Sequence, residues 1–157
     1  MGSSGYLLGI DIGTSSIKAA LVDVATGTSA GSSTSPQTEL PISSPQPGWA
    51  EQAPELWWEH TIKAIAGLDR DKCKAVVAVG ISYQMHGLVA LDKADQVVRP
   101  SIIWADSRAV PYGEKAFAEL GEERCLKRLL NSPGNFTVSK LAWLKENEPD
   151  SFSRTAH

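Results

Sequence analysis

Cysteine, long hydrophobic runs and an excess of positive charge are all scarce in this sequence of 157 residues. The two cysteines, Cys73 and Cys125, lie 52 positions apart, which does not support a disulfide scaffold or a cysteine-rich zinc site. Lys and Arg number 15 against 18 Asp and Glu, and without a basic block a nucleic-acid partner is not expected. The longest apolar run, Ala75–Val79, is far shorter than the ~20 residues of a membrane-spanning helix.

What remains is an ordinary globular composition, with 42% hydrophobic and 21% charged residues. A length of 157 residues predicts one domain with a real core, which we place at residues 6–157. Residues 1–5 have the composition of a flexible start or a tag remnant, and they lack the basic and apolar regions of a signal peptide. We therefore expect a cytoplasmic protein that has no membrane partner.

Hydrophobic periodicity predicts a mixed α/β chain whose elements begin in the order βββαβ. Short turns between the first three strands favour an antiparallel meander. A proline-rich segment, 36–54, is expected to be an ordered loop because it contains Leu40, Ile42 and Trp49 as apolar anchors. The strands are expected at 6–12, 17–24, 28–35 and 74–82, and the helix between the last two at 56–68, entered through Pro54.

The strand at 74–82 is a continuous run of Val, Ala and Ile without polar alternation. Such runs are typical of parallel strands buried on both faces, so we place this strand at the centre of the sheet. After it, the sequence predicts a hairpin over 88–99, a short strand at 101–104, and helices from Ala109 onward. The last of these helices is expected to be capped by Thr137 and to end at Pro149.

The turn after the first strand is the first candidate site. Asp11 stands at the end of this strand, and Gly13 lets the backbone approach a ligand closely. Thr14 and Ser15 offer hydroxyl and N–H donors for phosphate, while the Asp11 carboxylate is a ligand for Mg²⁺. The alternative is a hairpin turn with a solvated aspartate, and the turn alone does not decide between the two.

Two later loops follow predicted strands. Met85 and His86 come directly after the 74–82 strand, where α/β sheets bind ligands; Met85 suits an apolar face and His86 a hydroxyl or carbonyl group. A structural histidine is the alternative. Trp104 offers a stacking wall for a sugar, and Asp106 with Arg108 forms either a set of hydroxyl ligands or an ion pair that holds the loop.

Taken together, these motifs resemble the N-terminal part of the FGGY family of carbohydrate kinases, which includes glycerol kinase and xylulokinase. The resemblance is strongest to the xylulokinase branch. It rests on five stretches, namely Tyr6–Lys18, Pro47–Trp58, Gly80–Leu88, Arg99–Arg108 and Phe136–Trp143.

The resemblance implies a ribonuclease-H-like, actin-like ATPase fold with ATP and Mg²⁺ as cofactors and a homodimer as one state of the full-length enzyme. It implies that Asp11 lies near the metal and the γ-phosphate, with Gly13, Thr14 and Ser15 along the phosphates. It places Met85, His86, Trp104 and Asp106 at the sugar, and it places Asn135 near a position that contacts substrate in some members. Glycerol-specific members carry an Arg-Glu pair where this chain has Met85-His86, which favours D-xylulose as the substrate.

The resemblance also places the catalytic aspartate base of the family beyond residue 157, so the chain alone is expected to be an inactive N-terminal fragment. Three alternatives stay open. The complete protein acts on another ketose, a polyol or a sugar acid; the chain is a non-catalytic actin-like nucleotide-binding module; or it is a truncated product without an independent role.

Overall fold

The structure is a computed structural model that describes residues 5–157, so the expectation for the first four residues lies outside it. The chain divides into two compact units. Unit 1 contains the chain up to Pro41 together with Glu55–Gln84, and unit 2 contains Ile42–Pro54 and Met85–His157. The range expected to be one domain therefore contains two hydrophobic cores, one in each unit. None of the helices in the described part is long and apolar enough to cross a membrane.

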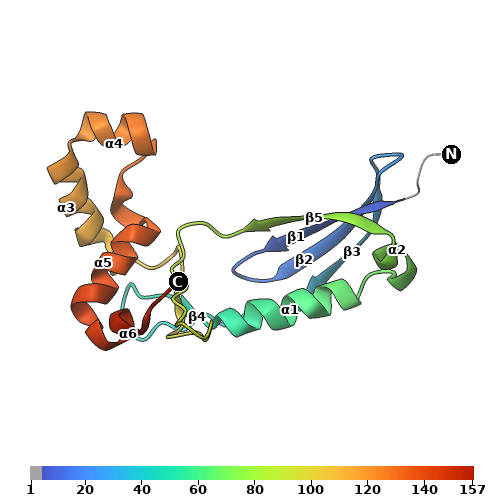
Figure 1. Cartoon of the computed structure of the whole chain (residues 1–157), viewed down its shortest axis with the longest axis horizontal. Helices are drawn as coiled ribbons and strands as arrows, with labels where there is room; N and C mark the ends of the chain where they lie inside the picture. The colour runs from blue at the N-terminus through green and yellow to red at the C-terminus, as the bar shows by residue number, and fades with distance from the viewer. Residues whose placement is uncertain (1–4) are drawn as a thin grey trace. The chain divides into compact units, whose positions relative to one another are not determined.

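Unit 1 is a four-stranded sheet with the strand order β3-β2-β1-β5. The strands are β1 (Tyr6–Ile12), β2 (Ile17–Asp23), β3 (Ser29–Ser35) and β5 (Val76–Tyr83). The first three pair antiparallel, and β5 pairs parallel to β1. A parallel neighbour requires a crossover connection, and α1 (Pro54–Ala66) and α2 (Arg70–Lys74) lie within it (Figure 1).

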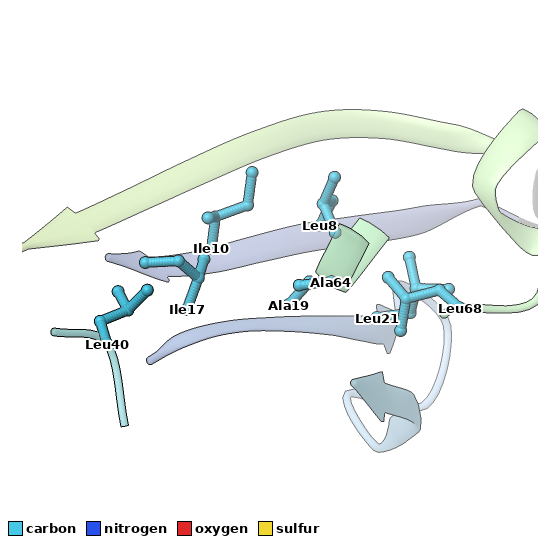
Figure 2. Packing of buried hydrophobic residues seen from close by; sticks show 8 residues of the cluster. All are labelled: Leu8, Ile10, Ile17, Ala19, Leu21, Leu40, Ala64 and Leu68. Carbon is cyan, nitrogen blue, oxygen red and sulfur yellow. The ribbon is translucent and has the colours of Figure 1, made fainter. Parts of the chain in front are cut away.

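One face of this sheet is covered and the other is open. Alternate residues of β1 and β2 point toward α1, which runs along the sheet in Figure 1. Figure 2 shows the resulting core, in which strand side chains meet Ala64 of α1. Its buried members are Leu8, Ile10, Ile17, Ala19, Leu21, Leu40, Ala64 and Leu68.

The position of β5 corrects a prediction. The strand is parallel, as expected, but it lies at the edge of the described sheet, and its side chains are exposed rather than buried on both faces. Val79, Ile81 and Tyr83 are 56%, 61% and 71% exposed. A continuous apolar run indicates that a strand can be buried, but it does not show which residues of the protein bury it.

Unit 2 has little sheet. Two short strands, β4 (Glu51–Gln52) and β6 (Ser101–Ile102), pair antiparallel, and the predicted hairpin over 88–99 is reduced to a bridge between Leu91 and Val97. Its helices pack around a core formed by Leu88, Ala90, Ile102, Ala109, Trp143 and Leu144. They are α3 (Val110–Leu120), α4 (Glu122–Leu129), the 3-10 turn η1 (Pro133–Asn135), α5 (Thr137–Asn147) and α6 (Pro149–Arg154).

The residues at the helix ends confirm one expectation and correct another. Asp69 caps α2, and its Oδ1 accepts hydrogen bonds from the backbone N–H groups of Asp71 and Lys72, each 2.9 Å long. Helix α5 ends at Asn147, which confirms the end expected at Pro149, and Pro149 itself is the first residue of α6, where its missing N–H is no loss. Thr137 does not cap α5, because Phe136 occupies the cap position and the Thr137 hydroxyl bonds elsewhere.

Candidate functional site

The turn from β1 to β2 is held by its own backbone. The Gly13 N–H donates a hydrogen bond of 3.1 Å to the Ser16 carbonyl oxygen, and a Cβ atom on Gly13 would come within 2.9 Å of that same oxygen. Glycine is therefore needed at this position for steric reasons. The Thr14 hydroxyl donates to Gln84 Oε1 over 3.1 Å, which joins the turn to the residue that follows β5.

Asp11 lies on the open face of the sheet, next to this turn. The hairpin register places it opposite Lys18 on β2, and the parallel register places it beside Ser82 on β5. All three line a shallow depression of about 490 Å³, whose floor includes Gly9 and Gly80. The structure thus brings the predicted phosphate residues together in unit 1 and adds Lys18 and Ser82, which the sequence analysis missed. Because four residues separate β1 from β2, the hairpin register pairs Asp11 with Lys18, and this pairing could have been predicted from the length of the turn.

The donor set at Asp11 limits what metal it could hold. Within residues 5–157, no group of three His, Cys, Asp or Glu side chains is arranged to hold an ion. A single carboxylate fits the way proteins bind Mg²⁺ with a nucleotide, in which one or two carboxylates act together with phosphate oxygens and water. The residues present therefore fit a metal that arrives with a phosphate ligand rather than a resident metal.

The Met85–Gly87 loop belongs to unit 2. The Met85 side chain is exposed, whereas His86 is half-buried and stacks on Phe136 with ring centroids 4.8 Å apart and an interplanar angle of 12°. His86 has a φ of 64°, a conformation that non-glycine residues adopt rarely and often at functional sites. The Gly87 carbonyl oxygen accepts a 3.1 Å hydrogen bond from the Thr137 hydroxyl. The loop is therefore held at two adjacent points.

Trp104 and Asp106 follow β6 but differ in accessibility. The Trp104 side chain is half-exposed, and its carbonyl oxygen accepts a hydrogen bond from the Asn135 side-chain amide. Asp106 is only 1% exposed, and its carboxylate accepts hydrogen bonds from Ala50 N at 2.6 Å and from the Arg108 guanidinium at 2.7–3.0 Å. Of the two interpretations of Asp106, the structure favours the ion pair over a contact with a ligand.

Arg108 is the centre of a buried charge cluster that the sequence only partly suggested. Its guanidinium also lies 2.7 Å from Glu51 Oε1, and Glu51 in turn pairs with Arg99. The rings of Trp49 and Trp143 lie 3.6 Å and 4.9 Å from the Arg108 guanidinium carbon. These contacts hold the loop after β6 against the proline-rich segment and β4, which indicates a structural role for the Asp106–Arg108 pair.

Comparisons with known proteins show the family and the fold of the chain. The model of the FGGY family of carbohydrate kinases, N-terminal domain, matches residues 6–157. Xylulose kinase of Escherichia coli (strain K12) is 39% identical over 147 residues, which cover 92% of this chain and 29% of that protein. Glycerol kinase of Gloeobacter violaceus is 32% identical over 90% of this chain and 28% of its own length.

Among solved structures, a xyloylose kinase from Brucella ovis superposes with a TM-score of 0.84 at 37% identity, covering 96% of this chain and 31% of that one. This likeness confirms the predicted α/β, actin-like ATPase fold. The chain thus spans about 30% of the length of such relatives. On the match of its family model and the sequence identity of its relatives, the chain belongs to the FGGY family of carbohydrate kinases, whose N-terminal domain it matches.

Proposed function

We propose that the complete protein transfers the γ-phosphoryl group of MgATP to D-xylulose and gives D-xylulose 5-phosphate. The observation that carries this proposal is the Met85-His86 pair in the loop that follows β5, at the position where the family resemblance implies an Arg-Glu pair in glycerol-specific members. The 39% identity to a xylulose kinase supports the same substrate. The glycerol kinase relative makes a polyol the second candidate, and a sugar acid or another ketose the third.

In this proposal unit 1 binds the nucleotide phosphates. Bound MgATP supplies the phosphoryl group, and catalysis of its transfer is mostly positioning and charge stabilisation. The Asp11 carboxylate would bind Mg²⁺ directly or through water. The Ser15 N–H would donate a hydrogen bond to a phosphate oxygen, and the Thr14 hydroxyl would do the same in place of its bond to Gln84. Gly13, whose N–H is bonded to Ser16, would let the phosphates approach the backbone closely, and the Lys18 ammonium beside Asp11 would add positive charge.

Unit 2 binds the sugar in this proposal. The exposed Met85 side chain covers an apolar edge of the ketose, the His86 ring donates or accepts one hydrogen bond, and Trp104 supplies a stacking surface. Asp106 keeps the loop in place without touching the sugar, because its oxygens are already bonded. We further propose that the enzyme is cytoplasmic and that a homodimer is one of its states.

The proposed inactivity of the 157-residue chain alone follows from the family resemblance, which places the aspartate base elsewhere. It is supported by the 29% of the E. coli enzyme that the chain spans. Phosphorylation of D-xylulose by the isolated chain would contradict it.

The test is a coupled ADP-release assay on the complete gene product with MgATP and, separately, D-xylulose, glycerol and gluconate. We expect activity on D-xylulose and its loss by at least about a hundredfold in Asp11→Asn, as in the removal of a strong electrostatic contact at a reacting centre. Asp71→Asn is the matched control, because Asp71 is exposed on α2 and its carboxylate forms a surface ion pair with Lys74.

Turnover of glycerol or gluconate without D-xylulose would replace the proposed substrate and leave the family assignment intact. Binding of MgATP without turnover of any sugar would favour the non-catalytic module instead.

A further inference from the structure

Lys140 on α5 is a buried lysine with an unusual environment. The residue is 0% exposed, and its ammonium donates hydrogen bonds to the Asn135 backbone carbonyl oxygen at 2.8 Å and to Asn135 Oδ1 at 2.6 Å. Burial lowers the pKa of Lys140 to about 8, against the opposing effect of the nearby Asp106 carboxylate. A lysine is almost never fully buried without a specific partner, because removing an ammonium from water is unfavourable.

The two hydrogen bonds from Lys140 determine which way the Asn135 amide points. An ammonium group only donates, so it must face Oδ1 and not the NH₂ group. The Asn135 NH₂ group is thereby directed outward, and it donates to the Trp104 carbonyl oxygen. The chain of contacts runs from a buried charge, through one amide, to the backbone of a residue proposed to bind the sugar.

The two residues after Asn135 contact the other substrate loop. Phe136 stacks on the His86 ring, and the Thr137 hydroxyl donates to the Gly87 carbonyl oxygen. Three consecutive residues thus touch both loops, Met85–Gly87 and Trp104–Arg108. Their own position is fixed, because the Ser139 hydroxyl donates to the Pro133 carbonyl oxygen over 2.7 Å and the Lys140 N–H donates to the Phe136 carbonyl oxygen over 3.2 Å.

We infer that Lys140 is a positioning residue for sugar binding. By orienting the Asn135 amide, Lys140 fixes the position of the Trp104 loop. Its hydrogen bonds also fix the Asn135–Thr137 segment, which contacts His86 and Gly87 in the other loop. This inference rests on the proposed function, in which the Met85–Gly87 and Trp104–Arg108 loops bind a sugar. The side chain of Lys140 does not touch the sugar itself. Loss of the contact is therefore expected to weaken sugar binding and to leave the nucleotide side in unit 1 unchanged.

The most informative variant is Asn135→Asp. A carboxylate in place of the amide keeps the acceptor for Lys140 and pairs with its charge, but it has no N–H to donate to Trp104. Lys140→Met removes the ammonium at the start of the chain of contacts while keeping an unbranched side chain. Lys145→Met is the matched control, because it makes the same change on an exposed position of α5.

The first measurement uses the ¹⁵N-labelled 157-residue chain and follows the indole N–H signals of its five tryptophans. The Trp104 signal is identified by its loss in Trp104→Phe. We expect this signal to shift in Asn135→Asp and in Lys140→Met and to stay in place in Lys145→Met. If it stays in place in a folded Asn135→Asp, the inference is wrong, and this holds even where Lys140→Met fails to fold.

The second measurement takes the complete gene product and determines KM for D-xylulose and for MgATP. A net hydrogen bond is worth about 1 kcal/mol, so Asn135→Asp should raise KM for the ketose about five- to tenfold and leave KM for MgATP within about twofold. Equal changes in both constants would indicate a merely structural role. If the protein phosphorylates no sugar at all, the proposed function fails, and the indole signal still decides the positioning role.

Discussion

The guanidinium carbon of Arg108 lies 3.6 Å from the centroid of the Trp49 ring, and the same group is paired with the buried carboxylates of Asp106 and Glu51. Planar stacking and two-point pairing at once are contacts that arginine can make and lysine cannot. The proline-rich segment that contains Trp49 is thereby joined to the loop after β6.

We expect Arg108→Met to lower the free energy of unfolding of unit 2 by about 3 kcal/mol, because the buried Asp106 carboxylate loses the positive charge of the guanidinium that pairs with it. Urea denaturation followed by tryptophan fluorescence measures this, since Trp49 and Trp143 both lie in unit 2. Arg124→Met is the control, because Arg124 is exposed on α4. Equal midpoints for the two variants would show that the cluster adds no stability.

The β1–β2 turn requires glycine at position 13 for steric reasons, whereas position 80 on β5 has room for a larger residue. Gly13→Ala should destabilise unit 1 by about 1–3 kcal/mol, because its Cβ would lie 2.9 Å from a backbone oxygen that the turn cannot easily move. Gly80→Ala makes the same chemical change at a position with no heavy atom within 4 Å of the new Cβ. Thermal unfolding of the two variants should therefore differ, and a Gly13→Ala variant as stable as Gly80→Ala would contradict the geometry of the turn.

The backbone of His86 predicts which substitutions the loop accepts. Asparagine adopts positive φ readily, whereas a β-branched residue does not. We expect His86→Val to be less stable than His86→Asn by about 1–2 kcal/mol, although both lose the stack on Phe136. Chemical denaturation of the pair isolates the backbone effect. Equal stability would mean that the positive φ is not kept in solution.

The parts of the fold and of the candidate site that the sequence predicts are those that depend on contacts between residues close together in the chain. Strands β1 to β3 and helix α1 follow from periodicity and turns, and the Asp11 turn could be predicted as a candidate site because its residues are consecutive. The edge position of β5 was missed, because an apolar run carries no information about which residues cover it. Lys140 was missed for a similar reason, since the role proposed for it depends on a helix start that contacts two loops about 30 and 50 residues away.

The exposed edge strand predicts self-association of the chain. Val77, Val79 and Ile81 on β5 combine high exposure with unpaired backbone groups along the free side of the strand in the described sheet. We expect Ile81→Lys to lower the weight-average mass seen in sedimentation velocity at high protein concentration. Ile62→Lys, an exposed apolar position on α1, serves as the control. If both substitutions have the same effect, the association is not specific to the β5 edge.

The buried ammonium of Lys140 predicts how stability depends on pH. Its pKa is lowered from 10.5 to about 8 in the folded chain, chiefly by burial, so between these values the unfolded state binds more protons than the folded state. Stability contributed by this group therefore rises with pH in that window, and the penalty of burying the charge is fully present below pH 8. Relative to Lys140→Met, the free energy of unfolding of the wild-type chain should rise between pH 8 and pH 10 by an amount on the order of 1–3 kcal/mol. Urea denaturation at several pH values measures both chains, and Lys145→Met should track the wild type throughout. A difference between wild type and Lys140→Met that stays constant over this range would mean that Lys140 keeps an ordinary pKa in the folded chain.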